Sequence, residues 1–164
     1  MFWRRVFKIL HELGSAGVIG AFATILVLVL FAPSPTDSLP AYAATRLHIA
    51  TVSKWVLTPS LLAVLVSGLG AMALNPAYHD AGWAWVKALT GLAMFEGTLL
   101  TVDATARRAA EWASAALQSG TADLATLEPL LRREQGGLWA LLAIALANVV
   151  LGVWRPRFRR AGAP

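Results

Sequence analysis

Twenty consecutive residues near the start of the chain, 13–32, include no charged side chain. At about 1.5 Å rise per residue, a helix of this length crosses the ~30 Å hydrocarbon core of a bilayer. Two further uncharged runs and one nearly uncharged run follow: residues 55–74, 135–154 and 82–102. Lys87 and Glu96 are the only charged residues in the third of them. These runs predict an integral membrane protein.

The composition of the chain agrees with a membrane location. Hydrophobic residues make up 57% and charged residues 14%, against about 25% charged residues in an average soluble domain. The 164 residues leave room for four spans but not for a separate soluble domain. We therefore expect an all-α fold, an integral membrane four-helix bundle that forms one transmembrane domain over 1–164. Its spans are expected at about 7–32, 52–74, 82–102 and 135–154.

The connection 103–134 is the longest stretch outside these spans. Its first part has the pattern of an amphipathic helix, Ser119-Gly120 predicts a break, and Thr121 predicts the N-cap of a second short helix. We expect a non-spanning connection here, a short amphipathic helical insertion between spans 3 and 4. In the second span, Pro59 lacks a backbone donor and predicts a kink one or two residues before it.

Basic residues gather at the two ends of the chain. They account for seven of the fourteen Lys and Arg residues: Arg4, Arg5, Lys8, Arg155, Arg157, Arg159 and Arg160. This placement is typical of contacts with anionic lipids and of the positive-inside bias, and it favours the lipid bilayer over nucleic acid as a partner. Because four spans put both termini on one side, we expect a multi-pass protein of a bacterial inner membrane with cytoplasmic termini. A cleaved signal peptide is not expected, since the first apolar stretch exceeds the usual 7–15 residues.

Two histidines and a lysine are candidates for a cofactor site. In this topology His11, His79 and Lys87 lie in one leaflet or at its edge, whereas His48 lies at the opposite edge. Imidazole is a common axial ligand of haem, and an apolar helical bundle supplies walls of low dielectric constant. His11, His79 and Lys87 are therefore candidate cofactor-binding residues, with His11 as the metal ligand. The chain has no cysteine, which excludes disulfides and thiolate sites.

Small residues share one face of the first span. Gly14, Gly17, Ala21 and Thr24 follow a spacing of three and four, and they lie one to four turns beyond His11. They could leave room for a macrocycle. The same spacing also lets two helices pack closely in lipid. The residues by themselves leave both uses open.

Glu96 falls near the middle of the third span. An unpaired carboxylate there would cost several kcal/mol or take up a proton, so we expect Glu96 to be protonated or paired and to face the bundle interior. Thr98 and Asn148 are further polar residues within the spans. A seam of these three residues could relay protons or lock the helices together.

Four short motifs resemble a known family. They are Leu10-His11-Glu12-Leu13-Gly14, the proline-containing segment 57–62, the Gly-Trp start of the third span at 82–89, and Val153-Trp154-Arg155-Pro156. In this order they are similar to motifs of the HemJ/CopD-like superfamily of small four-span bacterial membrane proteins. That superfamily includes HemJ-type protoporphyrinogen oxidases, the membrane domain of CopD copper-resistance proteins, and related membrane proteins of unknown function.

The resemblance implies a site and a function. In HemJ-type members the first-span histidine and the third-span lysine are essential and associated with b-type haem, which carries over to His11 and Lys87. We expect a membrane protein that binds haem b and is linked to redox chemistry or electron transfer. One alternative is a protoporphyrinogen oxidase of the HemJ type. Another is a cofactor-free structural subunit, which packs with other membrane protein subunits or as a homo-oligomer.

Overall fold

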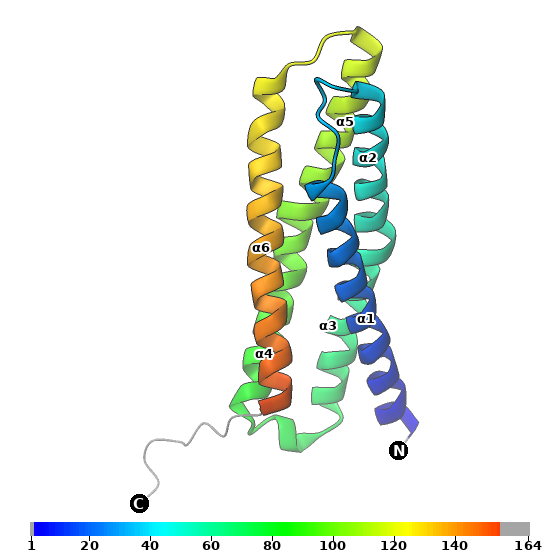
Figure 1. Ribbon diagram of the computed structural model, residues 1–164. Helices are drawn as coiled ribbons and strands as arrows, with labels where there is room; N and C mark the ends of the chain where they lie inside the picture. Colours follow the sequence, from blue (N-terminus) through cyan, green and yellow to red (C-terminus); the bar gives the residue numbers. More distant parts are fainter. Residues whose placement is uncertain (1, 155–164) are drawn as a thin grey trace, which may run out of the picture.

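The computed structural model describes residues 2–154, which form helices and connecting turns without a strand (Figure 1). The basic residues expected to contact lipid beyond position 154 lie outside the described residues. Four long helical rods make up the fold. The elements in chain order are α1 (Phe2–Leu30), α2 (Leu39–Val52), the π-helical η1 (Ser53–Leu57), α3 (Thr58–Ala73), the short η2 (Pro76–Tyr78), α4 (Gly82–Gly97), the π-helical η3 (Thr98–Asp103), α5 (Ala104–Ser119) and α6 (Leu124–Trp154).

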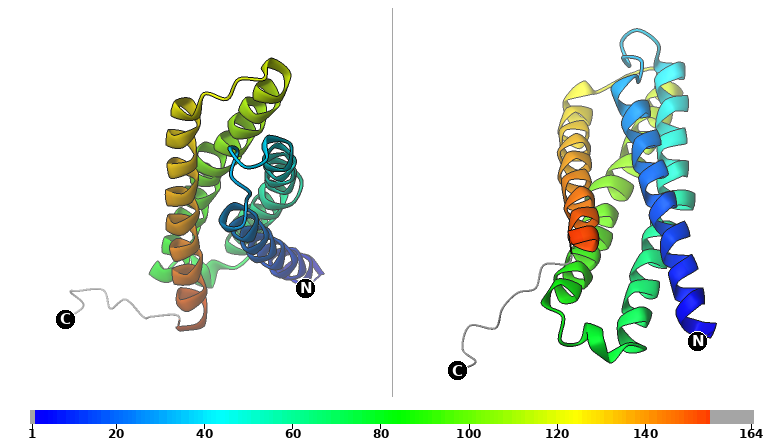
Figure 2. Two further views of the ribbon diagram at one scale, coloured as in Figure 1. Left: turned by 45° about the horizontal axis from the view of Figure 1, so that its top comes forward. Right: turned by 60° about the horizontal axis from the view of Figure 1, so that its bottom comes forward.

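The rods form a bundle with two halves. We call the half made by α1, α3, α4 and the C-terminal part of α6 the stem, and the half made by α2, α5 and 124–134 of α6 the head (Figure 1). The second rod runs from the head to the stem through η1, and the third returns through η3 (Figure 2). The start of α1 and the end of α6 lie at the same end of the bundle (Figure 1).

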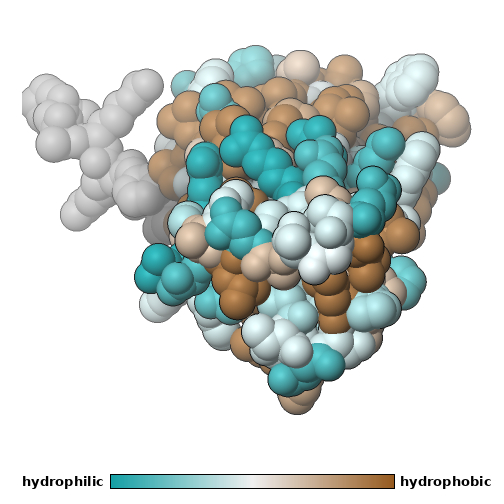
Figure 3. Space-filling model, turned by 90° about the horizontal axis from the view of Figure 1, so that it is seen from above, coloured by the Kyte–Doolittle hydropathy of each residue, from teal (hydrophilic) through white to brown (hydrophobic). Residues whose placement is uncertain are grey.

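Three of these rods are long and apolar enough to cross a membrane: Phe2–Leu30, Leu39–Ala73 and Leu124–Trp154. The 35 residues of Leu39–Ala73 would extend about 53 Å, well beyond a ~30 Å hydrocarbon core. A hydrocarbon core of this thickness would cover only part of the rod. Figure 3, which looks down onto the head, shows that hydrophilic side chains gather at this end.

The connection between the third and fourth rods differs from the predicted insertion. Because α5 continues α4 through η3, and α6 runs unbroken from Leu124 to Trp154, the region 103–134 consists of extensions of two rods and not of a separate element. The predicted break at Gly120 is confirmed, and this glycine adopts the left-handed conformation with φ 70°. The predicted cap at Thr121 is wrong. Asp123 caps α6 instead and accepts a hydrogen bond from the Ala125 amide at 3.1 Å.

The expected disturbance around Pro59 takes the form of a π turn. Proline offers no amide hydrogen to the carbonyl four residues before it, and the segment Ser53–Leu57, which ends two positions before Pro59, is π-helical. The Thr58 amide donates to the Ser53 carbonyl, five residues back. A second π segment, η3, has the same kind of bond, from the Ala104 amide to the Leu99 carbonyl. Each π turn rotates the residues that follow relative to an uninterrupted α-helix.

Two apolar clusters hold the bundle together. The larger lies in the stem and extends to Ile49 of α2 and Ala106 of α5. Its fully buried residues include Ile25, Leu57 and Val102. The smaller fills the head, where Ala109 and Ala113 of α5 pack with side chains of α2 and α6. Alanine side chains let helices approach closely.

Glycines on α1 serve close helix packing. A Cβ atom on Gly14 would lie 3.0 Å from the Ser60 carbonyl oxygen of α3, and one on Gly17 would collide with the Ser60 side chain. Gly20 has open space around it. The packing use of Gly14 and Gly17 is thereby confirmed, because backbone and side chain of α3 fill the space that these glycines leave.

Candidate functional site

His11 lies at the contact between α1 and α3. Its imidazole is half-buried, and its Nδ1 is 3.2 Å from the Val64 carbonyl oxygen and 3.1 Å from Ser67 Oγ. Its Cε1 would be 3.7 Å from a Cβ atom on Gly68, which is ordinary van der Waals contact. The ring is thus held by a carbonyl, a hydroxyl and a glycine on one helix.

The hydrogen bonds of Ser67 determine the tautomer of His11. The Ser67 hydroxyl donates to the Ala63 carbonyl oxygen at 2.5 Å, and the Val64 carbonyl can only accept. Nδ1 of His11 must therefore carry the hydrogen and donate it. In a neutral imidazole this leaves the lone pair on Nε2, which is the arrangement of a metal-binding histidine whose other nitrogen is oriented by a carbonyl.

The structure places the other two candidate residues elsewhere. The Nζ atom of Lys87 lies 2.7 Å from the position that a Cβ atom on Gly152 would take, so this lysine occupies the contact between α4 and α6. Its charge is within electrostatic reach of His11. His79 is exposed in the turn after α3, and its Nε2 is 3.0 Å from the Met72 carbonyl oxygen. His79 thus binds the C-terminal end of its neighbouring helix.

The three candidate residues do not form a common pocket. His11 and Lys87 are engaged in different helix contacts. One surface hollow of about 450 Å³ lies on α1, and neither His11 nor Lys87 lines it. Its lining consists of Arg5, Lys8, Ile9, Glu12 and Leu13. In the described part of the chain no group of three or more His, Asp or Glu side chains could hold a metal ion.

Glu96 does not face the bundle interior. Its side chain is exposed, whereas Met94 and Thr98, two residues to either side, are buried. Two residues correspond to about 200° of rotation on an α-helix, so Glu96 lies on the opposite face of α4. The expectation of an inward carboxylate is therefore wrong. The sequence pattern did not reveal which face of this mixed helix is packed.

The polar seam predicted around Glu96 is also not formed. Asn148 accepts a hydrogen bond from the Thr90 hydroxyl at 2.8 Å and donates one to the Ile144 carbonyl. Thr98 is fully buried, and its hydroxyl has no hydrogen-bond partner among the described residues. Asn148 therefore links α4 to α6 through Thr90, six residues before Glu96, and Glu96 takes no part in this link.

A buried ion pair in the head was missed by the sequence reasoning. Arg46 of α2 and Glu134 of α6 are 1% and 0% exposed, and Arg46 Nη2 is 2.7 Å from Glu134 Oε2. Both residues lie outside the four spans expected from the sequence. Tyr42 and Arg46 are four residues apart and precede the apolar Ile49, which is a weak signal of a buried helix face. Nothing in the sequence pairs Arg46 with Glu134, 88 positions away.

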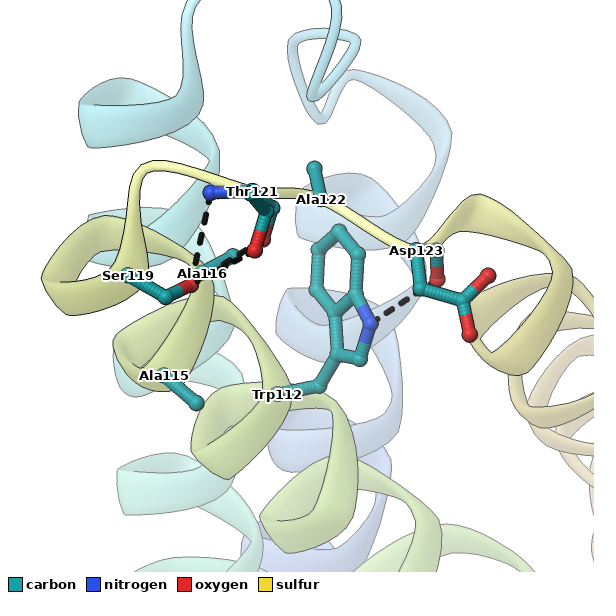
Figure 4. A pocket seen from close by; sticks show the side chains of 7 residues that line it. All are labelled: Trp112, Ala115, Ala116, Ser119, Thr121, Ala122 and Asp123. Carbon is teal, nitrogen blue, oxygen red and sulfur yellow. Dashed lines mark hydrogen bonds between the residues drawn. The ribbon is translucent and has the colours of Figure 1, made fainter.

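The top of the head contains a second hollow, of about 380 Å³ (Figure 4). Trp112 forms one wall, and its indole nitrogen donates to the Asp123 carbonyl oxygen at 3.0 Å. The Ser119 and Thr121 hydroxyls bond to each other at 3.0 Å on another side. A hydrogen bond from the Thr126 hydroxyl lowers the pKa of the Asp123 carboxyl. These contacts close the turn between α5 and α6, so the polar groups here serve the turn.

Comparison with known proteins identifies no relative: no family model, curated protein or solved structure matches this chain.

Proposed function

We propose that this chain is a four-span subunit of a bacterial inner-membrane assembly, with its termini in the cytoplasm, and that it packs against a second copy of itself through the outer face of α4. The observation that carries the proposal is the exposed carboxyl of Glu96 on α4. Glu96 lies 14 residues beyond Gly82, about 21 Å along the helix and within the expected span 82–102.

A carboxyl group at this depth needs a partner. As an anion in hydrocarbon, an unpaired carboxylate costs several kcal/mol. As a neutral acid, it has a hydrogen-bond donor and an acceptor that are both unpaired. The buried polar groups described above do not bond to Glu96. Thr90 and Asn148, for example, bond to each other. A partner from outside the chain removes this cost.

A second copy supplies such a partner at the correct depth. Copies of one chain insert in the same orientation, so that in a twofold dimer each residue of α4 meets α4 at its own level. Two Glu96 carboxyls then share one proton or form two hydrogen bonds. The side chains along the same face are large, apolar and exposed, which suits helix packing: Trp85, Leu89, Leu92 and Leu100.

Crosslinking tests this interface without background, because the chain has no cysteine. We expect Leu92→Cys to form a covalent dimer upon oxidation in membranes. Val150→Cys is the matched control, since Val150 is equally exposed but on α6, and we expect it to stay monomeric. Adding Glu96→Leu to Leu92→Cys should lower the dimer yield at least several-fold, whereas Glu96→Gln, which still forms hydrogen bonds, should not. Equal crosslinking at both positions, or none at Leu92→Cys, would refute the proposal.

A second candidate function is haem binding through His11, as the resemblance implies. The observation that favours it is the His11 tautomer, in which Nδ1 donates to a backbone carbonyl and Nε2 bears the lone pair. Bound haem b would supply one-electron redox chemistry. The role of the chain would be to hold His11 in this orientation through Val64 and Ser67.

An absorption spectrum tests this second candidate. If His11 ligates haem, the purified protein shows a Soret band, and His11→Ala abolishes it while membrane insertion persists, because the axial ligand is the main specific anchor. His48→Ala is the control and should leave the spectrum unchanged, since His48 is exposed on α2. Full haem content in His11→Ala, or a wild-type protein without a Soret band from haem-supplemented cells, contradicts this candidate.

A further inference from the structure

The head contains three buried polar atoms that have no hydrogen-bond partner among the described residues. They are Tyr42 Oη, Arg46 Nε and Glu134 Oε1. Their residues are 3%, 1% and 0% exposed, respectively. Buried polar groups in folded proteins are nearly always paired with a protein group or with water, and these three atoms belong to residues that lie one helical turn apart or in direct contact.

These atoms belong to one cluster. Tyr42 and Arg46 lie one turn apart on the same face of α2, and the guanidinium of Arg46 contacts the Glu134 carboxylate through Nη2 and Oε2 only. Arg46 Nε and Glu134 Oε1 take no part in this contact and have no hydrogen-bond partner among the described residues. The Tyr42 phenol is within electrostatic reach of both charges, and its ring packs edge-on against Trp112 at 6.1 Å.

The charges in the cluster determine which ligand it can take. An anion would be repelled by the Glu134 carboxylate, and a cation would be repelled by the Arg46 guanidinium. The unpaired atoms are one donor, Nε–H, one acceptor, Oε1, and one hydroxyl that can do either. The complement is a small neutral molecule that both donates and accepts hydrogen bonds.

We propose that Tyr42, Arg46 and Glu134 form a binding site for one internal water molecule. The water accepts a hydrogen bond from Arg46 Nε–H and donates one to Glu134 Oε1, while the Tyr42 hydroxyl donates to its second lone pair. Three bonds are typical of a buried water, and together they satisfy all three atoms. The water thereby joins α2 to α6 beside the direct ion pair.

Nuclear magnetic resonance of the full chain in detergent tests the site. In ¹⁵N-labelled protein we expect the Arg46 Nε–H proton to show a dipolar cross-peak to a long-lived water. Measured in the rotating frame, exchange with the solvent gives a peak of the opposite sign and is thereby distinguished. An Nε–H without this cross-peak, or with cross-peaks to the Tyr42 ring and none to water, would overturn the proposal.

Two tyrosine variants test whether Tyr42 belongs to the site. Tyr42→Phe keeps the ring against Trp112 but removes one bond to the water, so the Arg46 Nε–H resonance should shift and its water cross-peak should weaken at least twofold. Tyr78→Phe is the matched control, because Tyr78 lies in η2, at the other end of the bundle, and packs on Trp83. An Arg46 signal that is identical in Tyr42→Phe and wild type would refute the three-residue site.

Discussion

Glu134→Ala is expected to lower the free energy of unfolding by about 3–5 kcal/mol. The substitution leaves the Arg46 guanidinium buried at 1% exposure without the carboxylate 2.7 Å away that now balances it. A buried charge without a partner has lost its hydration and gains nothing in return. Unfolding followed by circular dichroism in detergent micelles measures the loss, and the variant should also lose contact between α2 and α6 in the head.

Two controls separate burial from charge. Glu128→Ala removes a carboxylate from the same helix. Glu128 Oε1 is 3.3 Å from Arg132 Nη1, but the two side chains are 66% and 71% exposed. The substitution should therefore change the free energy of unfolding only slightly. The double variant Arg46→Met, Glu134→Leu should recover most of the stability, because apolar side chains of similar size replace a buried pair at little cost. A loss below about 1 kcal/mol in Glu134→Ala would show that the pair is solvated.

Gly137→Ala is expected to cost about 1–3 kcal/mol through overpacking. A Cβ atom there would lie 2.5 Å from Thr101 Oγ1 and 2.7 Å from Thr101 Cβ. Thr101 cannot turn away freely, since its hydroxyl donates to the Gly97 carbonyl at 2.6 Å and its Cβ is attached to the backbone of η3. The third rod and α6 must therefore move apart where they now touch.

The neighbouring glycine provides the control for this prediction. A Cβ atom on Gly136 meets nothing within 4 Å, and alanine has the higher helix propensity, so Gly136→Ala should keep or slightly raise the melting temperature. The two variants differ by one position and are chemically identical. Equal melting temperatures would mean that α6 and η3 do not touch at Gly137.

How much of this fold was predictable depends on the element. The apolar run 13–32 predicts a membrane helix by its length alone, and α1 together with two further rods meets that criterion. The break at Gly120 was predictable as well, because glycine adopts a positive φ angle at little cost. Both are local properties, which a window of one helix contains.

The direction in which Glu96 points was not a local property. The third span has polar and apolar residues on all sides, and which face is packed depends on where Met94 and Thr98 find partners in other rods. The π segment η3 has a similar effect on Asp103. Asp103 follows Glu96 by seven residues, which in an uninterrupted α-helix would give a shared face, but η3 ends at Asp103, and Asp103 accepts a hydrogen bond from Ser53 of the neighbouring rod.

The sequence by itself determined that this chain is helical and suited to a membrane, since hydropathy and helix length are summed along consecutive residues. Only the tertiary structure decided that Arg46 meets Glu134, that the glycines of α1 lie against α3, and that Glu96 faces outward. The physical reason is that pairing and burial depend on the rotation and register of whole rods. Both are set by contacts between residues far apart in the chain and by π turns, which the hydropathy pattern does not contain.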